Sequence, residues 1–276
     1  MARKPQAGTL TRAANGPAGN WGLSLRGQRP VLAATALAIA LILHAASFVL
    51  PWQDGRFHYG FAKLLSVTVW IGVLLVWIES ARVEINRLTS LLAPLAIVLV
   101  VLPHFFPGVA FDLRTQPPLF VPHLIVGTLA YGVMFLAAMQ ALLMAAAQYR
   151  LHPRRSGDRP GPLTSLLARG NRPLPPLMVL ERILFRVIAI GFTLLLLTTV
   201  TGIVFSEETF GKPLPLNHKT VFSLIATVFV GLLLAGHWLW GWRGRIAIRM
   251  TLGGFVLLLL SYVGSRFVLE VVLRRI

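Results

Sequence analysis

The chain has 276 residues, of which 56% are hydrophobic and only 13% are charged. This composition is far from that of a soluble domain and is typical of a protein embedded in a lipid bilayer. The net charge of +17 does not indicate nucleic-acid binding, because the basic residues stand in short connections between apolar stretches. The chain contains no cysteine, which excludes disulfides, thiolate metal sites and thiol redox chemistry of its own.

Residues 1–30 are predicted to form a disordered basic arm on the cytoplasmic side. They include five basic and no acidic residues, are rich in Gly, Ala and Pro, and lack a periodic apolar face. A cleaved signal peptide is the alternative, because Arg29 precedes an apolar run that ends near Ala45 and Ala46. We favour an uncleaved first helix, since the run continues through Leu50 and is long for the apolar part of a signal peptide.

Seven stretches meet or approach the roughly 20 apolar residues that a helix needs to cross a bilayer. The predicted spans are 31–51, 60–78, 88–106, 119–148, 183–205, 219–240 and 247–270. With the N-terminus inside, 18 of the 26 lysines and arginines fall on the inner side, as the positive-inside rule favours. The sequence therefore predicts an all-α polytopic transmembrane bundle of about seven spans over residues 31–276, with its N-terminus inside.

The longest predicted connection, at about 149–182, divides the first four spans from the last three. It is rich in arginine and proline, so we expect a cytoplasmic loop with a short surface helix. Phosphate-loop, nicotinamide-binding, zinc-protease and serine-hydrolase motifs are absent from the sequence, and no acidic residue lies in the middle of a span. An accessory protein is therefore expected rather than an enzyme with a recognisable catalytic motif.

Histidines gather toward the outer side of the predicted bundle. His44 lies in the outer half of the first span, and His58 and His104 lie in or beside outer connections, where contact with water or headgroups is the expected role. His123 opens the fourth span and His218 opens the sixth. Polar groups at membrane depth are costly, so these positions are the first candidates for function.

His123 and His218 are predicted to be haem ligands. Small residues follow each of them along its helix, which favours close helix packing, and a pair of imidazoles between facing helices is a common haem-iron site. Lys219, Lys63 and Arg266 fall near the outer ends of their spans, where cations can pair with haem propionates. An interfacial or structural polar role is the alternative for both histidines.

His237 is predicted to belong to a different place in the molecule. It follows His218 by 19 residues on one helix, which corresponds to about 28 Å. Next to it stand Trp238, Trp240 and Arg243, an aromatic and basic belt typical of an inner membrane interface. We expect His237 to help anchor this end of the helix.

Several strings resemble a known family. His123 is followed by Leu129-Ala-Tyr131 and by residues 139–142, and this stretch resembles the opening of a helix in the cytochrome c assembly family of CcsA- and HemX-type haem-handling membrane proteins. Further strings that resemble the family are 181–192, 201–202, 218–220, 241–245, 254–255 and 261–267. The resemblance covers roughly residues 60–270.

The resemblance implies a protein of the bacterial inner membrane that binds or relays haem for attachment to apocytochrome c, alongside other maturation proteins. By position, His123 resembles the histidine that serves the family as an external haem ligand. His44 and His237 resemble histidines that larger members place within their spans.

The chain also departs from the full haem-attachment pattern. The tryptophan-rich loop of that pattern corresponds to residues 207–219, which contain no tryptophan. A further histidine after the last span is replaced by residues 270–273, and one span usual before the first is missing. The chain therefore resembles the smaller HemX- or YpjD-like branch.

Three functions follow as hypotheses. The leading one is a haem-binding membrane protein that assists cytochrome c assembly. The alternative is a non-catalytic scaffold or regulator of haem metabolism, which would use small-residue helix faces and the arginine-rich loop for partner contact. A small-molecule permease is disfavoured, because no paired broken helices or inverted halves are visible.

Overall fold

The computed structural model describes residues 21–49, 56–80, 86–151, 176–210 and 217–273. Its long helices are α1 (Trp21–Val49), α2 (Phe61–Ser80), α3 (Asn86–Phe105), α4 (Phe120–Leu151), α6 (Leu177–Phe210), α7 (His218–Trp240) and α8 (Arg245–Leu259). Two short strands, β1 (Arg56–Tyr59) and β2 (Val109–Asp112), and the short turn η3 (Leu113–Thr115) join them. The chain divides into two compact units, Met1–Ala46 and Ser47–Ile276, and the second is described below.

Five helical segments are long and apolar enough to cross a membrane. They are Phe61–Ile78, Phe120–Arg150, Leu177–Val204, His218–Trp240 and Arg245–Val272. Two shorter apolar stretches, Leu32–Phe48 and Leu92–Phe105, stand where the first and third spans were predicted. The prediction of an all-α membrane bundle is therefore confirmed, while the N-inside orientation stays a prediction.

Helix ends differ from the predicted span ends mainly where polar residues continue a helix beyond its apolar part. α1 begins at Trp21, ahead of the boundary at residue 30, and α6 begins at Leu177, six residues before the predicted span. The backbone N–H of Leu180 donates to Pro176 O, so the helix starts directly after the prolines. Residues 1–20 of the predicted arm and 152–175 of the predicted loop, with its surface helix, lie outside the described residues.

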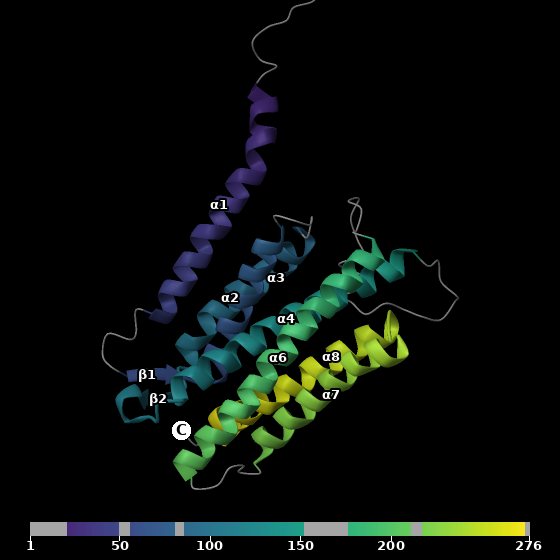
Figure 1. The fold of residues 1–276 in the computed structure, drawn as a ribbon. Helices are drawn as coiled ribbons and strands as arrows, with labels where there is room; N and C mark the ends of the chain where they lie inside the picture. The colour runs from purple at the N-terminus through teal and green to yellow at the C-terminus, as the bar shows by residue number, and fades with distance from the viewer. Residues whose placement is uncertain (1–20, 50–55, 81–85, 152–175, 211–216, 274–276) are drawn as a thin grey trace, which may run out of the picture. The chain divides into compact units, whose positions relative to one another are not determined.

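The second unit has two distinguishable ends. Figure 1 shows β1 and β2 beside the beginnings of α2 and α4, at the end where α6 finishes and α7 starts. The strands pair antiparallel, from Arg56 with Asp112 to Tyr59 with Val109. We call this the sheet end. At the opposite end α4 finishes, and α6 and α8 begin. We call it the arginine end, because arginines lie on these helices and between α7 and α8: Arg150, Arg182, Arg186, Arg243, Arg245 and Arg249.

α4 is the central helix of this unit. Residues 130–138 are buried without interruption, and α4 contacts α2, α6 and α8. A Cβ atom at Gly72 would lie 2.5 Å from Phe135 Cδ1, so the absence of a side chain there lets α2 approach α4 closely. Only 22% of the membrane-spanning window of α6 and 28% of that of α7 are buried, compared with 78% for α4, as expected for helices that face lipid.

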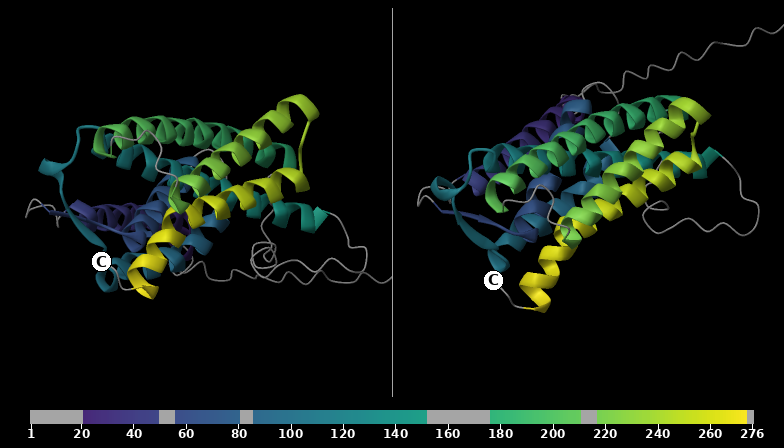
Figure 2. Two further views of the ribbon diagram at one scale, coloured as in Figure 1. Left: turned by 90° about the horizontal axis from the view of Figure 1, so that it is seen from below. Right: turned by 60° about the horizontal axis from the view of Figure 1, so that its bottom comes forward.

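The last helix is not a regular α-helix. α8 is followed by a π-helical segment η4 (Leu260–Gly264), the short α9 (Ser265–Phe267) and a second π-helical segment η5 (Val268–Val272). In both views of Figure 2 α7 and α8 run side by side, joined by a tight turn. π turns are frequent at functional sites in helices, so the residues of η4 and η5 are of interest for the site.

Candidate functional site

His123 lies on the first turn of α4 and packs against the end of α6. Its Nδ1 is 3.0 Å from Thr201 Oγ1. The hydroxyl of Thr201 donates to Leu197 O at 2.8 Å, so Thr201 Oγ1 can accept the proton of His123 Nδ1, and in that tautomer the lone pair of the ring lies on Nε2. A Cβ at Gly202 would lie 3.0 Å from His123 Cε1, which explains why the ring can rest on α6 at this point.

Lys219 and Arg266 share the ring of Tyr262. Lys219 Nζ lies 4.7 Å and Arg266 Cζ lies 5.8 Å from its centroid. Contacts of this kind stabilise a cation by about 0.5–1 kcal/mol at exposed sites. Lys219 also interacts electrostatically with His123, so α4, α7 and the last helix bring an imidazole and two cations into one region of the sheet end.

Buried hydrogen bonds fix the helices that carry these groups. The hydroxyl of Tyr131 on α4 donates to Leu258 O at 2.6 Å, just before the π-helical segment η4. The hydroxyl of Ser261 in η4 donates to Lys219 O at 2.9 Å. The last helix is therefore tied to α4 and to the first turn of α7 beside the shared aromatic ring.

The sheet also contacts the ring of Tyr262. Tyr59 of β1 meets Tyr262 edge to face, with ring centroids 5.7 Å apart, and its hydroxyl is 2.9 Å from Thr128 Oγ1. Burial, followed by the electrostatic effect of Tyr262, raises the pKa of Tyr59 far above its ordinary value. Tyr59 is therefore a neutral, hydrogen-bonded packing residue.

His218 is the first residue of α7 and is exposed. Its helix is capped by Asn217, whose side-chain oxygen accepts the N–H of Thr220 at 2.9 Å. The next residue, Lys219, is the one that interacts with His123. The first turn of α7 thus belongs to the same region as His123, and a ligand role for either histidine stays a prediction.

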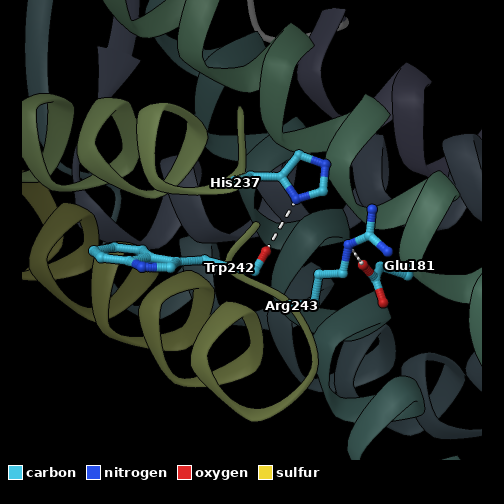
Figure 3. Close-up of polar contacts among 4 residues, drawn as sticks. All are labelled: Glu181, His237, Trp242 and Arg243. Atoms are coloured by element: carbon cyan, nitrogen blue, oxygen red, sulfur yellow. Dashed lines mark hydrogen bonds and ion pairs between the residues drawn. The ribbon is translucent and has the colours of Figure 1, made fainter. Parts of the chain in front are cut away.

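His237 lies at the arginine end, as Figure 3 shows. Its Nδ1 is 3.0 Å from Trp242 O, so the ring N–H donates to this carbonyl, and the imidazole stacks on Phe185 with centroids 3.5 Å apart. In Figure 3 the indole of Trp242 turns away from His237, and it covers Gly236. His237 therefore closes the turn between α7 and α8.

Arg243 follows in the same turn and faces α6 (Figure 3). Its Nε is 3.4 Å from Glu181 Oε1, while its side chain is 68% exposed. A cavity of about 280 Å³ lies here, lined by Met178, Glu181, Arg182, Phe185, His237 and Arg243. It is the second place where the structure gathers residues that could bind a ligand.

The remaining candidates lie elsewhere. His44 is buried on α1 in the first compact unit. Lys63 Nζ lies 5.2 Å from the centroid of Phe48, in a separate cation–π contact. His58 and His104 are exposed. Within the described ranges no three His, Asp or Glu side chains gather as around a bare metal ion, whereas a haem iron takes only one or two protein ligands.

Sequence reasoning gave no site role to Tyr262, Tyr59 or Thr201, although Tyr262 and Thr201 lie in strings that resemble the family. Tyr262 stands four residues before Arg266, which is the spacing of neighbours on one helix face and could have suggested their contact. The contacts of Tyr59 and Thr201 could not be predicted from local sequence, because their partners are far away in the chain.

Comparison with known proteins identifies one family. The profile of the family described as Cytochrome C assembly protein matches residues 30–273. The chain is 28% identical to Inner membrane protein YpjD of Escherichia coli strain K12 over 247 residues, 87% of this chain and 88% of YpjD. It is 29% identical to the Uncharacterized 28.8 kDa protein in nifR3-like 5'region of Azospirillum brasilense, over 83% of this chain and 82% of that protein.

A more distant relative carries a functional name. Cytochrome c biogenesis protein CcsA of Mesostigma viride is 20% identical over 233 residues, 77% of this chain and 75% of CcsA. No solved structure matches the chain. The similarity to YpjD and the membrane-spanning helices confirm the predicted location in the bacterial inner membrane. The chain belongs to the cytochrome c assembly protein family, and this membership supports a role in cytochrome c biogenesis.

Proposed function

We propose that this protein binds haem at the sheet end and handles it for cytochrome c assembly. The observation that carries the proposal is the state of His123. Its Nδ1 lies 3.0 Å from Thr201 Oγ1, and in the tautomer with the proton on Nδ1 the neutral ring has the Nε2 lone pair that a haem iron requires. A hydrogen bond of this kind also fixes the ring orientation and makes the imidazole a better ligand.

Two cations support the proposal. Lys219 and Arg266 share Tyr262, and they interact electrostatically with each other as like charges. An anionic group between or beside them would offset that repulsion, and a haem supplies two carboxylates. Lys219 and Arg266 are therefore the proposed partners of the propionates.

His218 is the residue proposed to bind the haem iron together with His123. It is the first residue of α7, directly before Lys219, and Lys219 interacts electrostatically with His123. When bound, haem would supply the redox-active iron and the vinyl groups that assembly of a c-type cytochrome consumes. This chain's contribution would be to bind and orient it for apocytochrome c or another maturation protein.

His44 and His237 take a secondary place in the proposal. His237 is about 28 Å from His218 along α7, so the two histidines cannot bind the same haem. A ligand role for His237 would require a second haem site. Its bond to Trp242 O also leaves Nε2 with the lone pair, which is compatible with a ligand role in addition to its role in the turn.

The test is a reduced-minus-oxidised absorption spectrum of the detergent-purified protein, alone and after haemin addition. We expect a six-coordinate signal in the wild type and its loss or change to five-coordinate in His123→Ala and in His218→Ala. His104→Ala is the matched control, because His104 is an exposed histidine near the sheet end at the finish of α3. Its spectrum should equal that of the wild type.

The absence of any signal in the wild type after haemin addition would overturn the proposal. The non-catalytic scaffold or regulator would then be the better hypothesis. A signal that persists in His123→Ala but disappears in His237→Ala would move the haem to the arginine end.

A further inference from the structure

The cavity at the arginine end is lined by groups that the haem proposal at the sheet end does not use. Arg182 and Arg243 both line it, the first from α6 and the second from the turn before α8. Figure 3 shows Arg243 oriented by Glu181 beneath the imidazole of His237. Two guanidinium groups from separate elements therefore flank one hollow.

Both guanidinium groups keep donors available. Arg243 engages Glu181 through Nε at 3.4 Å, which leaves the two terminal nitrogens for another acceptor. Among the described residues no carboxylate pairs with Arg182, and its side chain is exposed. A single Glu181 offsets less positive charge than the two arginines carry, so the hollow favours an anion.

The cavity also has an apolar side. Met178 is 78% exposed at its rim and Phe185 lines its wall. Nearby on α7, Trp238 and Trp240 are 83% and 64% exposed. Exposed indoles at the end of a membrane helix are typical of the membrane–water interface. The cavity therefore lies at the level where lipid headgroups meet acyl chains.

We propose that this cavity binds the phosphate of an anionic phospholipid, with Arg182 and Arg243 as donors and Met178 against the upper acyl chain. Arginine suits this task because its planar donors match a phosphate. Basic pockets between helices on the cytoplasmic side are known to hold such headgroups, and the predicted N-inside topology puts the arginine end on that side.

The experiment uses the full chain, purified in detergent and examined by native mass spectrometry with phosphatidylglycerol or phosphatidylcholine. We expect the wild type to retain phosphatidylglycerol in preference to phosphatidylcholine. The double variant Arg182→Gln with Arg243→Gln should bind phosphatidylglycerol at least about tenfold more weakly. Arg186→Gln with Arg249→Gln is the matched control, because it removes two exposed arginines of the same end that do not line the cavity.

An equal loss of phosphatidylglycerol affinity in the two double variants would overturn the proposed site, because binding would then depend only on the net charge of this end. If the cavity variant retains phosphatidylglycerol but loses haem absorbance, the two arginines bind haem carboxylates. That outcome would also overturn the lipid proposal. If the double variant does not fold, Arg182→Gln alone decides, because it breaks no ion pair among described residues, and an unchanged lipid affinity would contradict the proposal.

Discussion

The sheet end and the arginine end use similar residue types in different ways. At the sheet end His123, Lys219 and Arg266 come from three helices and meet around Thr201 and Tyr262. At the arginine end His237 bonds a residue only five positions away. The sheet end is thus built by contacts between distant elements, whereas the arginine end combines a local turn with the contacts of His237 and Arg243 to α6, so the effects of a substitution should extend further at the sheet end.

Two glycines with positive φ offer the largest expected contrast. Gly108 at the sheet end has φ +80°, and a Cβ there would lie 2.6 Å from the backbone N of Gly60. Gly241 at the arginine end has φ +65°, and a Cβ there would meet nothing within 4 Å. We expect Gly108→Ala to destabilise the protein by about 3 kcal/mol or more, and Gly241→Ala by about 1 kcal/mol.

Thermal unfolding of both variants in the same detergent measures this contrast. The midpoint of Gly108→Ala should fall well below that of Gly241→Ala. Equal midpoints would contradict the view that the sheet end is the more tightly built of the two.

Replacing Tyr262 tests the shared ring. Tyr262→Leu should cost about 2 kcal/mol, because a buried aromatic ring, two cation contacts and the edge-to-face contact with Tyr59 disappear together. Tyr262→Phe keeps the ring and should cost less than half as much. Unfolding midpoints measure stability, and haemin titration should show weaker binding in the leucine variant; identical behaviour of the two variants would remove Tyr262 from the site.

A smaller and more local effect is expected at His237. His237→Ala removes the bond to Trp242 O and the stack on Phe185, at a cost of about 1 kcal/mol. Hydrogen exchange of the Trp242 amide, which donates to Gly236 O at 3.1 Å, should become faster. Exchange in α4 should not change; faster exchange there would show that the turn is coupled to the rest of the bundle.

The smallest effect is expected from the ion pair. Arg243→Gln breaks the contact with Glu181, but the guanidinium is largely exposed, so the loss should stay below about 1 kcal/mol. Raising the salt concentration should reduce the difference from the wild type. A larger loss in the unfolding midpoint would mean that Glu181 and Arg243 are less solvated than their exposure indicates.

Much of the fold could be predicted because the hydrophobicity of a span is a local property. The predicted span 219–240 differs from α7 by one residue, and the span 60–78 lies almost entirely within α2. The strands β1 and β2 were not predicted, since their pairing joins Arg56 to Asp112 across two helices and no local pattern records it.

The candidate site was only partly accessible from the sequence. Lys219 and Arg266 were expected near the outer ends of their spans, which follows from position in a helix. Their common contact with Tyr262 depends on how α7 packs against η4, and that packing is set by side-chain fit rather than by hydropathy. Haem ligation by His123 and His218 remains a prediction.

The two π-helical segments, η4 and η5, affect how the length of the last helix can change during evolution as well as its geometry. A π turn holds one more residue than an α turn, so each segment behaves like a single-residue insertion. Deleting Val263 would restore regular winding and keep the later side chains, including Arg266 beside Tyr262, on their present faces. The length of this stretch can therefore change by the single residue that a π turn takes up, whereas a deletion in the regular part of α8 would rotate the later side chains by about 100°.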